Sequence, residues 1–130
     1  LDSPALASNI DARATHALPV FVEVNVSGEA TKHGCAPSDV SALIDVVEAS
    51  AHLRLAGFMT VGLNSPVEAD VRAAYAQLRG IRDEASARLG IDESDLALSM
   101  GMSRDLEWAI AEGATIVRLG TAVFGERRLR

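Results

Sequence analysis

Lysine and cysteine are scarce in this sequence. Of the 12 lysine and arginine residues only Lys32 is a lysine, and Cys35 is the single cysteine among 130 residues. One cysteine excludes a disulfide within the chain and is typical of a reducing compartment, so we expect a cytoplasmic protein.

Positive charge and long apolar runs are also lacking. The formal net charge is −6 and no run of basic residues interrupts the acidic balance, so nucleic acid and anionic membranes are not expected partners. Neither a signal-peptide pattern nor a long uninterrupted apolar stretch is present, which argues against export by that route and against a membrane span. The length predicts a single domain over residues 1–130.

Several motifs of known chemistry are missing as well. The sequence contains no Ser-His-Asp order, no P-loop and no dinucleotide-binding glycine fingerprint. His33 and Cys35 lack a second ligand pair at suitable spacing, so no metal site is predicted.

What the sequence does contain is an alternation of apolar runs and segments with helical spacing. Strands are predicted at about 20–26, 53–61, 96–100 and 116–119, and helices at about 6–14, 38–47, 67–89 and 103–112. Short connections between alternating strands and helices predict parallel strands joined by right-handed crossovers. A complete (β/α)₈ barrel typically needs about 250 residues, so these four units predict half a barrel or a small open α/β sheet.

Two helices carry specific expectations. Ser38 is the expected N-cap of a helix whose apolar face contains Val40, Leu43, Ile44 and Val47. The helix after Ser103 is expected to turn Leu106, Ala109 and Ile110 inward. In the longest helix, the only tyrosine, Tyr75, falls on the core face.

Two segments of the last third predict a phosphate site: LSMGMSRD (98–105) and VRLGTAVFGERR (117–128). Each is a short apolar strand that breaks into a Gly/Ser/Thr-rich turn, and such turns can surround a phosphate with N–H groups and hydroxyls. Ser103 could hold an anion or simply cap the next helix. Gly120 and Thr121 could contact a phosphate or form an ordinary turn. Asp105 would repel a phosphate unless it points away.

Arg118 lies within an apolar strand beside these turns. A guanidinium there needs a partner, either a buried carboxylate or a ligand. Side-chain alternation places Arg118 on the same face as Gly120, which favours a ligand-facing role. The loop 27–34 after the first strand is expected to be solvated surface, in which Lys32 alone is a weak signal.

Four blocks together resemble the pyridoxal phosphate homeostasis protein family, whose members adopt the alanine-racemase-type (β/α)₈ TIM barrel of fold type III. The blocks are VEVNVSGEATKHG (22–34), AGFMTVG (56–62), LSMGMSRDLEWAIAEGAT (98–115) and VRLGTAVFGERR (117–128). They occur in family order over nearly the whole chain, and the resemblance implies that the chain is roughly the C-terminal half of a barrel. Phe58 and Gly62 depart from the family pattern in the second block.

The resemblance implies a pyridoxal 5′-phosphate site. By position, Ser103, Gly120 and Thr121 would hold the phosphate, with Ser99 or Met102 nearby. Arg118 would face the pyridine nitrogen, and Asn25 and Lys32 match polar positions of a mid-barrel loop. The Schiff-base lysine of the family lies in a half that this chain lacks, and Lys32 matches a different position. This chain alone is therefore expected to form no covalent link to the cofactor.

The implied function is that of a pyridoxal phosphate carrier with little or no catalysis of its own. We expect the intact protein to be a monomer, with enzymes that depend on pyridoxal phosphate as candidate recipients. An amino-acid racemase of the same fold is the alternative, although it needs an acid/base pair for which Tyr75 is an unconvincing candidate. An unrelated phosphate-binding half-barrel is a third reading.

Overall fold

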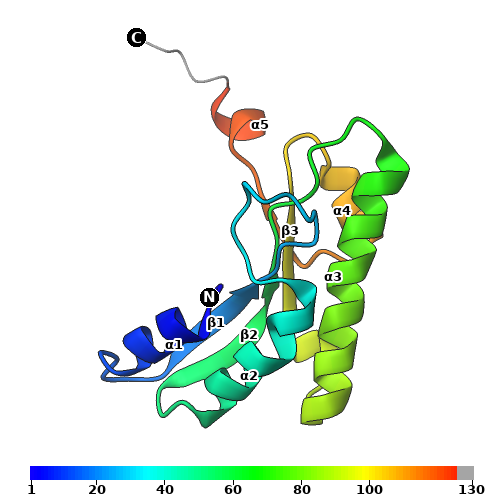
Figure 1. The fold of residues 1–130 in the computed structure, drawn as a ribbon. Helices are drawn as coiled ribbons and strands as arrows, with labels where there is room; N and C mark the ends of the chain where they lie inside the picture. The colour runs from blue at the N-terminus through cyan, green and yellow to red at the C-terminus, as the bar shows by residue number, and fades with distance from the viewer. Residues whose placement is uncertain (126–130) are drawn as a thin grey trace.

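Strands and helices alternate along the chain to form one four-stranded parallel sheet. The structure is a computed structural model and describes residues 1–125. The strands are β1 (Leu18–Glu23), β2 (Leu53–Met59), β3 (Ala97–Met102) and β4 (Ile116–Arg118), in the spatial order β1-β2-β3-β4. The helices are α1 (Pro4–Asp11), α2 (Val40–Ala49), α3 (Glu68–Leu89), α4 (Leu106–Ala111) and α5 (Thr121–Phe124), with 3₁₀ turns η1 (Pro37–Asp39) and η2 (Glu93–Asp95) (Figure 1). The predicted parallel α/β architecture is confirmed.

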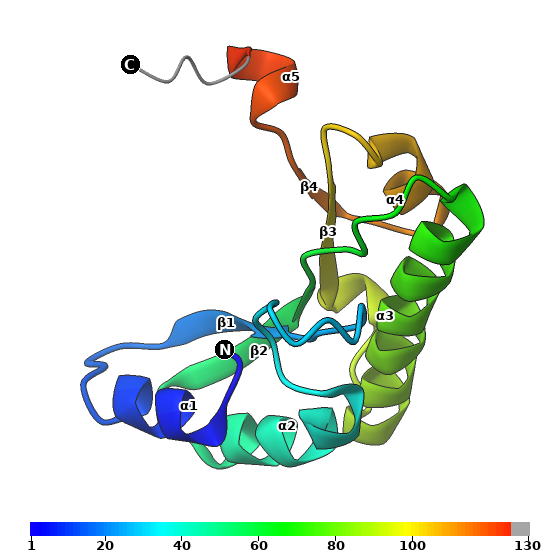
Figure 2. The same ribbon diagram turned by 45° about the horizontal axis from the view of Figure 1, so that its top comes forward.

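The helices α1 to α4 cover the outer face of the sheet, which curves away from them (Figure 2). Their apolar stripes form the core with the strand residues that point the same way. The predicted face of α2 is confirmed, since its four apolar residues are at most 4% exposed. Tyr75 on α3 is fully buried, as predicted. The largest fully buried side chains are Tyr75, Phe58, Leu43, Leu53, Leu78, Leu96, Leu98 and Met100.

Gly57 lets β2 and β3 approach one another. Its φ of 151° is a conformation that side chains disfavour, and a Cβ on it would lie 2.7 Å from the Ala97 nitrogen. The register of β1 against β2 also shifts here, because Val20 pairs with Leu55 and Phe21 with Gly57. The missing side chain therefore permits both the bulge and the pairing of Gly57 with Ala97.

Helix α4 packs closely on β3 because Gly101 also lacks a side chain. A Cβ at Gly101 would overlap that of Ala109, which is fully buried. The expectation that Ile110 faces inward is wrong, since it is 55% exposed. Ala109 is the buried residue of this helix and lies against Gly101 of β3.

The predicted N-cap at Ser38 is also wrong. Pro37 begins the 3₁₀ turn η1, so the chain is already helical at Ser38, and Asp39 is the N-cap of α2 without a side-chain bond to the helix. The first strand ends at Glu23 rather than Val26. Beyond it the backbone pairs with the returning loop, because Asn25 donates its N–H to the Cys35 carbonyl.

An ion-pair cluster joins α3 to the end of α4. Glu112 accepts hydrogen bonds from Arg72 and Arg79 at 2.8 Å each, and its side chain is 10% exposed. The bond from Arg72, followed by that from Arg79, lowers the pKa of Glu112 below its usual value. Within residues 1–125, no helix is both long and apolar enough to cross a membrane.

We expect Gly57→Ala to lower the free energy of unfolding of the intact protein by about 2–4 kcal/mol, because the new Cβ overlaps β3 and the backbone is strained. Gly80→Ala is the matched control. Gly80 lies inside α3 with open space around it, so alanine should stabilise by about 0.5–1 kcal/mol. Urea denaturation measures both variants, and a neutral Gly57→Ala would contradict the proposed role of Gly57.

Glu112→Gln is expected to destabilise the protein by about 1 kcal/mol near neutral pH. Because the pKa of Glu112 is lower in the folded state, its stabilising contribution is present above the usual carboxyl pKa and is lost as the pH falls through the lowered value. Denaturation from about pH 7 to about pH 3 should show the difference from wild type shrinking. The control Glu48→Gln removes an exposed carboxylate without an ion pair among the described residues, so it should change little at any pH. A difference that grows in acid would refute the assignment.

Candidate functional site

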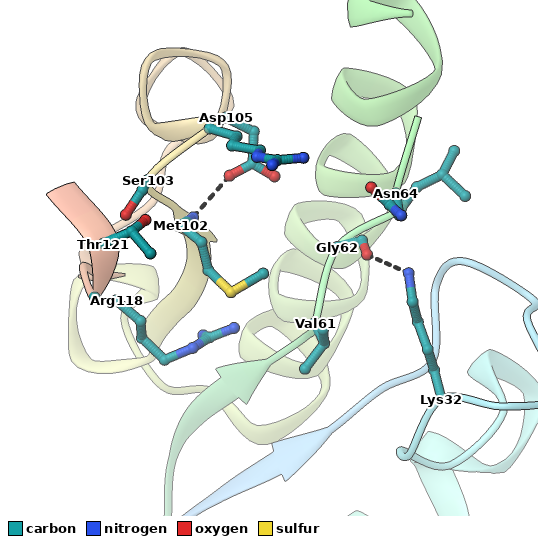
Figure 3. A pocket seen from close by; sticks show the side chains of 12 residues that line it. Lys32, Val61, Gly62, Asn64, Met102, Ser103, Asp105, Arg118 and Thr121 are labelled. Carbon is teal, nitrogen blue, oxygen red and sulfur yellow. Dashed lines mark hydrogen bonds between the residues drawn. The ribbon is translucent and has the colours of Figure 1, made fainter. Parts of the chain in front are cut away.

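The loops that follow all four strands meet around one cavity of about 420 Å³. Parallel strands bring their carboxyl ends to the same edge, so loops far apart in sequence become neighbours there. Figure 3 shows the side chains that line this cavity. The lining residues are Lys32, Val61, Gly62, Leu63, Asn64, Met102, Ser103, Arg104, Asp105, Arg118, Gly120 and Thr121.

Arg118 is held at the cavity by neutral oxygen atoms. Its Nη1 donates to the carbonyl and hydroxyl oxygens of Ser99, both at 3.0 Å, and its Nη2 donates to the Thr60 carbonyl at 2.8 Å. Within residues 1–125 it pairs with no carboxylate, so the buried ion pair weighed above is not found there. These contacts use neutral oxygen atoms and leave further N–H groups of the guanidinium for a ligand.

The two predicted phosphate turns lie side by side. Figure 3 shows the hydroxyls of Ser103 and Thr121 close together at one end of the cavity. Ser103 is not the N-cap of α4, because Asp105 holds that position. Instead its Oγ accepts a hydrogen bond of 3.2 Å from the Ala122 N–H in the first turn of α5. The structure thus decides against capping, and the hydroxyl joins the two turns.

Both carboxylate oxygens of Asp105 accept hydrogen bonds. Tyr75 donates its hydroxyl to Oδ2 at 2.6 Å, and the Met102 N–H donates to Oδ1 at 2.7 Å. Burial, followed by the bond to Asp105, raises the pKa of Tyr75 well above its ordinary value. The carboxylate that could have repelled a phosphate therefore supports the turn at Met102.

Lys32 contributes to the opposite wall. Its Nζ donates to Glu29 Oε1 at 2.7 Å and to the Gly62 carbonyl at 2.6 Å, and the hydrogen bond from Lys32 lowers the pKa of Glu29. Its side chain is only 16% exposed, so the expectation of a solvated loop is wrong at this position. Arg104 and the segment 61–64 were not predicted to line the cavity, although each follows closely on the end of a strand.

Asn25 and Ser99 are not among the lining residues but form hydrogen bonds to two of them, Lys32 and Arg118. The Asn25 side chain donates to the carbonyls of Glu29 and Lys32, at 2.9 and 3.3 Å, and accepts from Ser27 Oγ at 2.8 Å. It therefore shapes the loop that carries Lys32. Ser99 is 8% exposed and holds Arg118. Met102 does line the cavity, with its sulfur directed inward (Figure 3). The direct cofactor contacts expected of Asn25 and Ser99 stay predictions.

The cavity is cationic in an acidic chain. Among the described residues, Lys32, Arg104 and Arg118 line it, against the single carboxylate of Asp105. The Ser103 and Thr121 hydroxyls and the Asn64 amide add further polar groups. Residues 126–128 of the second signature segment lie outside the described residues. Cations together with hydroxyls and free N–H groups suit a phosphorylated ligand.

Curated relatives resemble nearly the whole chain. A pyridoxal phosphate homeostasis protein of Pseudomonas aeruginosa is 50% identical over 110 residues, which cover 85% of this chain and 45% of that protein. The protein of that name from Aquifex aeolicus is 40% identical over 131 residues, covering 98% and 57%, respectively. The human protein of that name is 34% identical, covering 98% and 49%. The chain thus spans about half the length of these relatives.

Solved structures show the same fold. An uncharacterised protein from Bifidobacterium adolescentis has a TM-score of 0.88 and 39% identity, covering 95% of this chain and 51% of that one. PipY of Synechococcus elongatus, solved with pyridoxal phosphate bound, has a TM-score of 0.79 and 30% identity, covering 96% and 58%. Alanine racemase from Corynebacterium glutamicum, at 16% identity and a TM-score of 0.69, covering 98% and 35%, shows the fold alone.

These neighbours confirm the fold expected from the sequence, of which this chain forms a part. The family model described as the alanine racemase N-terminal domain matches residues 1–128. The chain therefore belongs to the alanine racemase N-terminal domain family.

Proposed function

We propose that the protein containing this chain binds pyridoxal 5′-phosphate at the cavity and acts in the homeostasis of that cofactor as a carrier or buffer. The observation that carries the proposal is the convergence of Arg118, Ser103 and Thr121 on one cationic cavity. The printed names of the curated relatives and the ligand of PipY support it.

The lining residues fit the cofactor's two polar ends. Ser103, Gly120 and Thr121 would hold the phosphate through hydroxyls and backbone N–H groups, beside Arg104. Arg118 would face the pyridine nitrogen from the floor of the cavity. The cofactor, when bound, supplies an aldehyde and an electron-accepting ring.

Arg118 favours storage over catalysis. A guanidinium keeps its proton at physiological pH, so a ring nitrogen that faces it stays unprotonated. An unprotonated ring withdraws electrons weakly and stabilises a carbanion poorly. The bonds to Ser99 and Thr60 keep the guanidinium in place without lowering its charge.

Tyr75 is unsuited to be the acid/base of a racemase. It is fully buried, its hydroxyl is bonded to Asp105, and its raised pKa keeps the proton on the oxygen. We therefore favour the carrier over the racemase-like enzyme, with a cytoplasmic location and enzymes that depend on pyridoxal phosphate as recipients. Robust alanine racemisation by the purified intact protein would overturn this preference.

The proposed phosphate-binding residues, Ser103, Gly120 and Thr121, are tested by comparing the binding of pyridoxal 5′-phosphate with that of pyridoxal. Fluorescence titration of the intact protein should give a dissociation constant about 10- to 100-fold lower for the phosphorylated compound, because charge-assisted hydrogen bonds hold the phosphate. Ser103→Ala should reduce this preference about tenfold. Ser38→Ala, an exposed serine before α2, is the control and should leave it unchanged. Equal affinity for both compounds in the wild-type protein would refute the site.

Covalent attachment is expected at a lysine outside these 130 residues. Lys32 is bound to Glu29 and to the Gly62 carbonyl, which hold its amine in place. After borohydride reduction of the intact protein with pyridoxal phosphate, mass spectrometry should find the label elsewhere. A stoichiometric label on Lys32 would contradict this expectation, and no label anywhere would argue against the family's usual attachment.

A further inference from the structure

A continuous chain of contacts joins lining residues of the cavity through Tyr75, which lies behind them. It begins at Lys32, whose amine donates to the Gly62 carbonyl at 2.6 Å. Gly62 packs on the Tyr75 side chain, whose hydroxyl donates to Asp105 at 2.6 Å. Asp105 in turn accepts the Met102 N–H at 2.7 Å, at the start of the turn that presents Ser103. The chain joins the loops after β1, β2 and β3.

Gly62 makes room for the tyrosine hydroxyl. A Cβ at this position would overlap the hydroxyl oxygen and lie 2.8 Å from two ring carbons. The glycine that departs from the family pattern in this chain therefore complements Tyr75. No positive φ is involved, so the requirement is one of space alone.

Asp105 needs both hydrogen-bond partners because, of the residues that the structure describes, it is the one carboxylate lining the cavity. Its Oδ1 accepts a hydrogen bond from the Met102 N–H, and its Oδ2 accepts one from the Tyr75 hydroxyl. These two bonds stabilise the negative charge and hold the carboxylate at the cavity wall. Without the hydroxyl, Oδ2 loses its donor among the described residues. The carboxylate is then free to rotate toward the cavity, where it would repel a bound phosphate.

We propose that Tyr75 is a positioning residue that maintains the preference for phosphorylated ligands. Tyr75 acts from helix α3, outside the lining, by holding the Asp105 carboxylate on the Met102–Ser103 turn and away from the phosphate. The inference rests on the proposed function, because it concerns the same cavity and the same phosphate.

The test measures the ratio of the dissociation constants of pyridoxal and pyridoxal 5′-phosphate in the intact protein. Free pyridoxal closes largely to an internal hemiacetal in water and pyridoxal 5′-phosphate does not, so the change in this ratio from wild type to variant is what reports the phosphate contacts. Tyr75→Phe should weaken pyridoxal phosphate about tenfold and leave pyridoxal unchanged, because one hydrogen bond to a charged group is lost. Gly62→Ala should have a similar effect, because it displaces the hydroxyl.

A second substitution separates charge from packing. Asp105→Asn keeps an oxygen for the Met102 N–H and removes the charge, so it should retain the wild-type ratio within about threefold. Tyr75→Phe combined with Asp105→Asn should then restore the ratio that Tyr75→Phe loses, since no carboxylate remains to repel the phosphate. Gly62→Ala combined with Tyr75→Phe should be no worse than either change alone.

Val47→Ala is the structural control. Val47 is a buried residue of α2 outside the cavity lining, so its truncation should lower stability and leave the ratio unchanged. If the wild-type protein does not prefer pyridoxal phosphate, the proposed function and this inference both fail. If the wild type does prefer pyridoxal phosphate, two results would overturn the positioning role alone. One is that Tyr75→Phe keeps the full ratio, and the other is that Tyr75→Phe combined with Asp105→Asn fails to recover it.

Discussion

Parallel hydrogen bonding between neighbouring strands is the constraint on which the rest of this structure depends. It aligns the ends of β1 to β4 at one edge, so four loops separated by up to 90 residues or so share one cavity. The pairing of β2 with β3 requires the bare backbone of Gly57 against Ala97. Arg118 then joins the ends of three strands through the Ser99 and Thr60 oxygens.

The cavity remains cationic because the guanidinium of Arg118 is held by neutral groups, whereas the carboxylate of Asp105 is held by hydrogen-bond donors. Arg118 rests on neutral carbonyls and a hydroxyl, which orient it without cancelling its charge. Asp105 is stabilised by two donors that face it from the wall. Lys32 pairs with the carboxylate of Glu29. A chain with net charge −6 thereby keeps a local surface suited to an anion.

Periodic apolar patterns predicted the long elements well, and local rules failed at their ends. The buried faces of α2 and α3 followed from spacing, because burial repeats with the helical period. Ser38 was predicted to be an N-cap from its residue type, yet Pro37 starts the first helical turn early. Capping was one of two roles left open for Ser103, which bonds to α5 instead. Residue type cannot distinguish a hydroxyl that caps its own helix from one that joins a segment distant in sequence.

The sequence by itself determined the parallel α/β class, the buried faces of the long helices and the two turns that flank Arg118, since each is a local pattern. Only the tertiary structure decided that Lys32 faces the same cavity, that Asn25 shapes a loop behind it and that Tyr75 holds Asp105. The reason is physical. The contacts of Lys32 with Gly62 and of Tyr75 with Asp105 each join residues 30 positions apart, and such contacts exist only once the strands have paired and the helices have packed on the sheet.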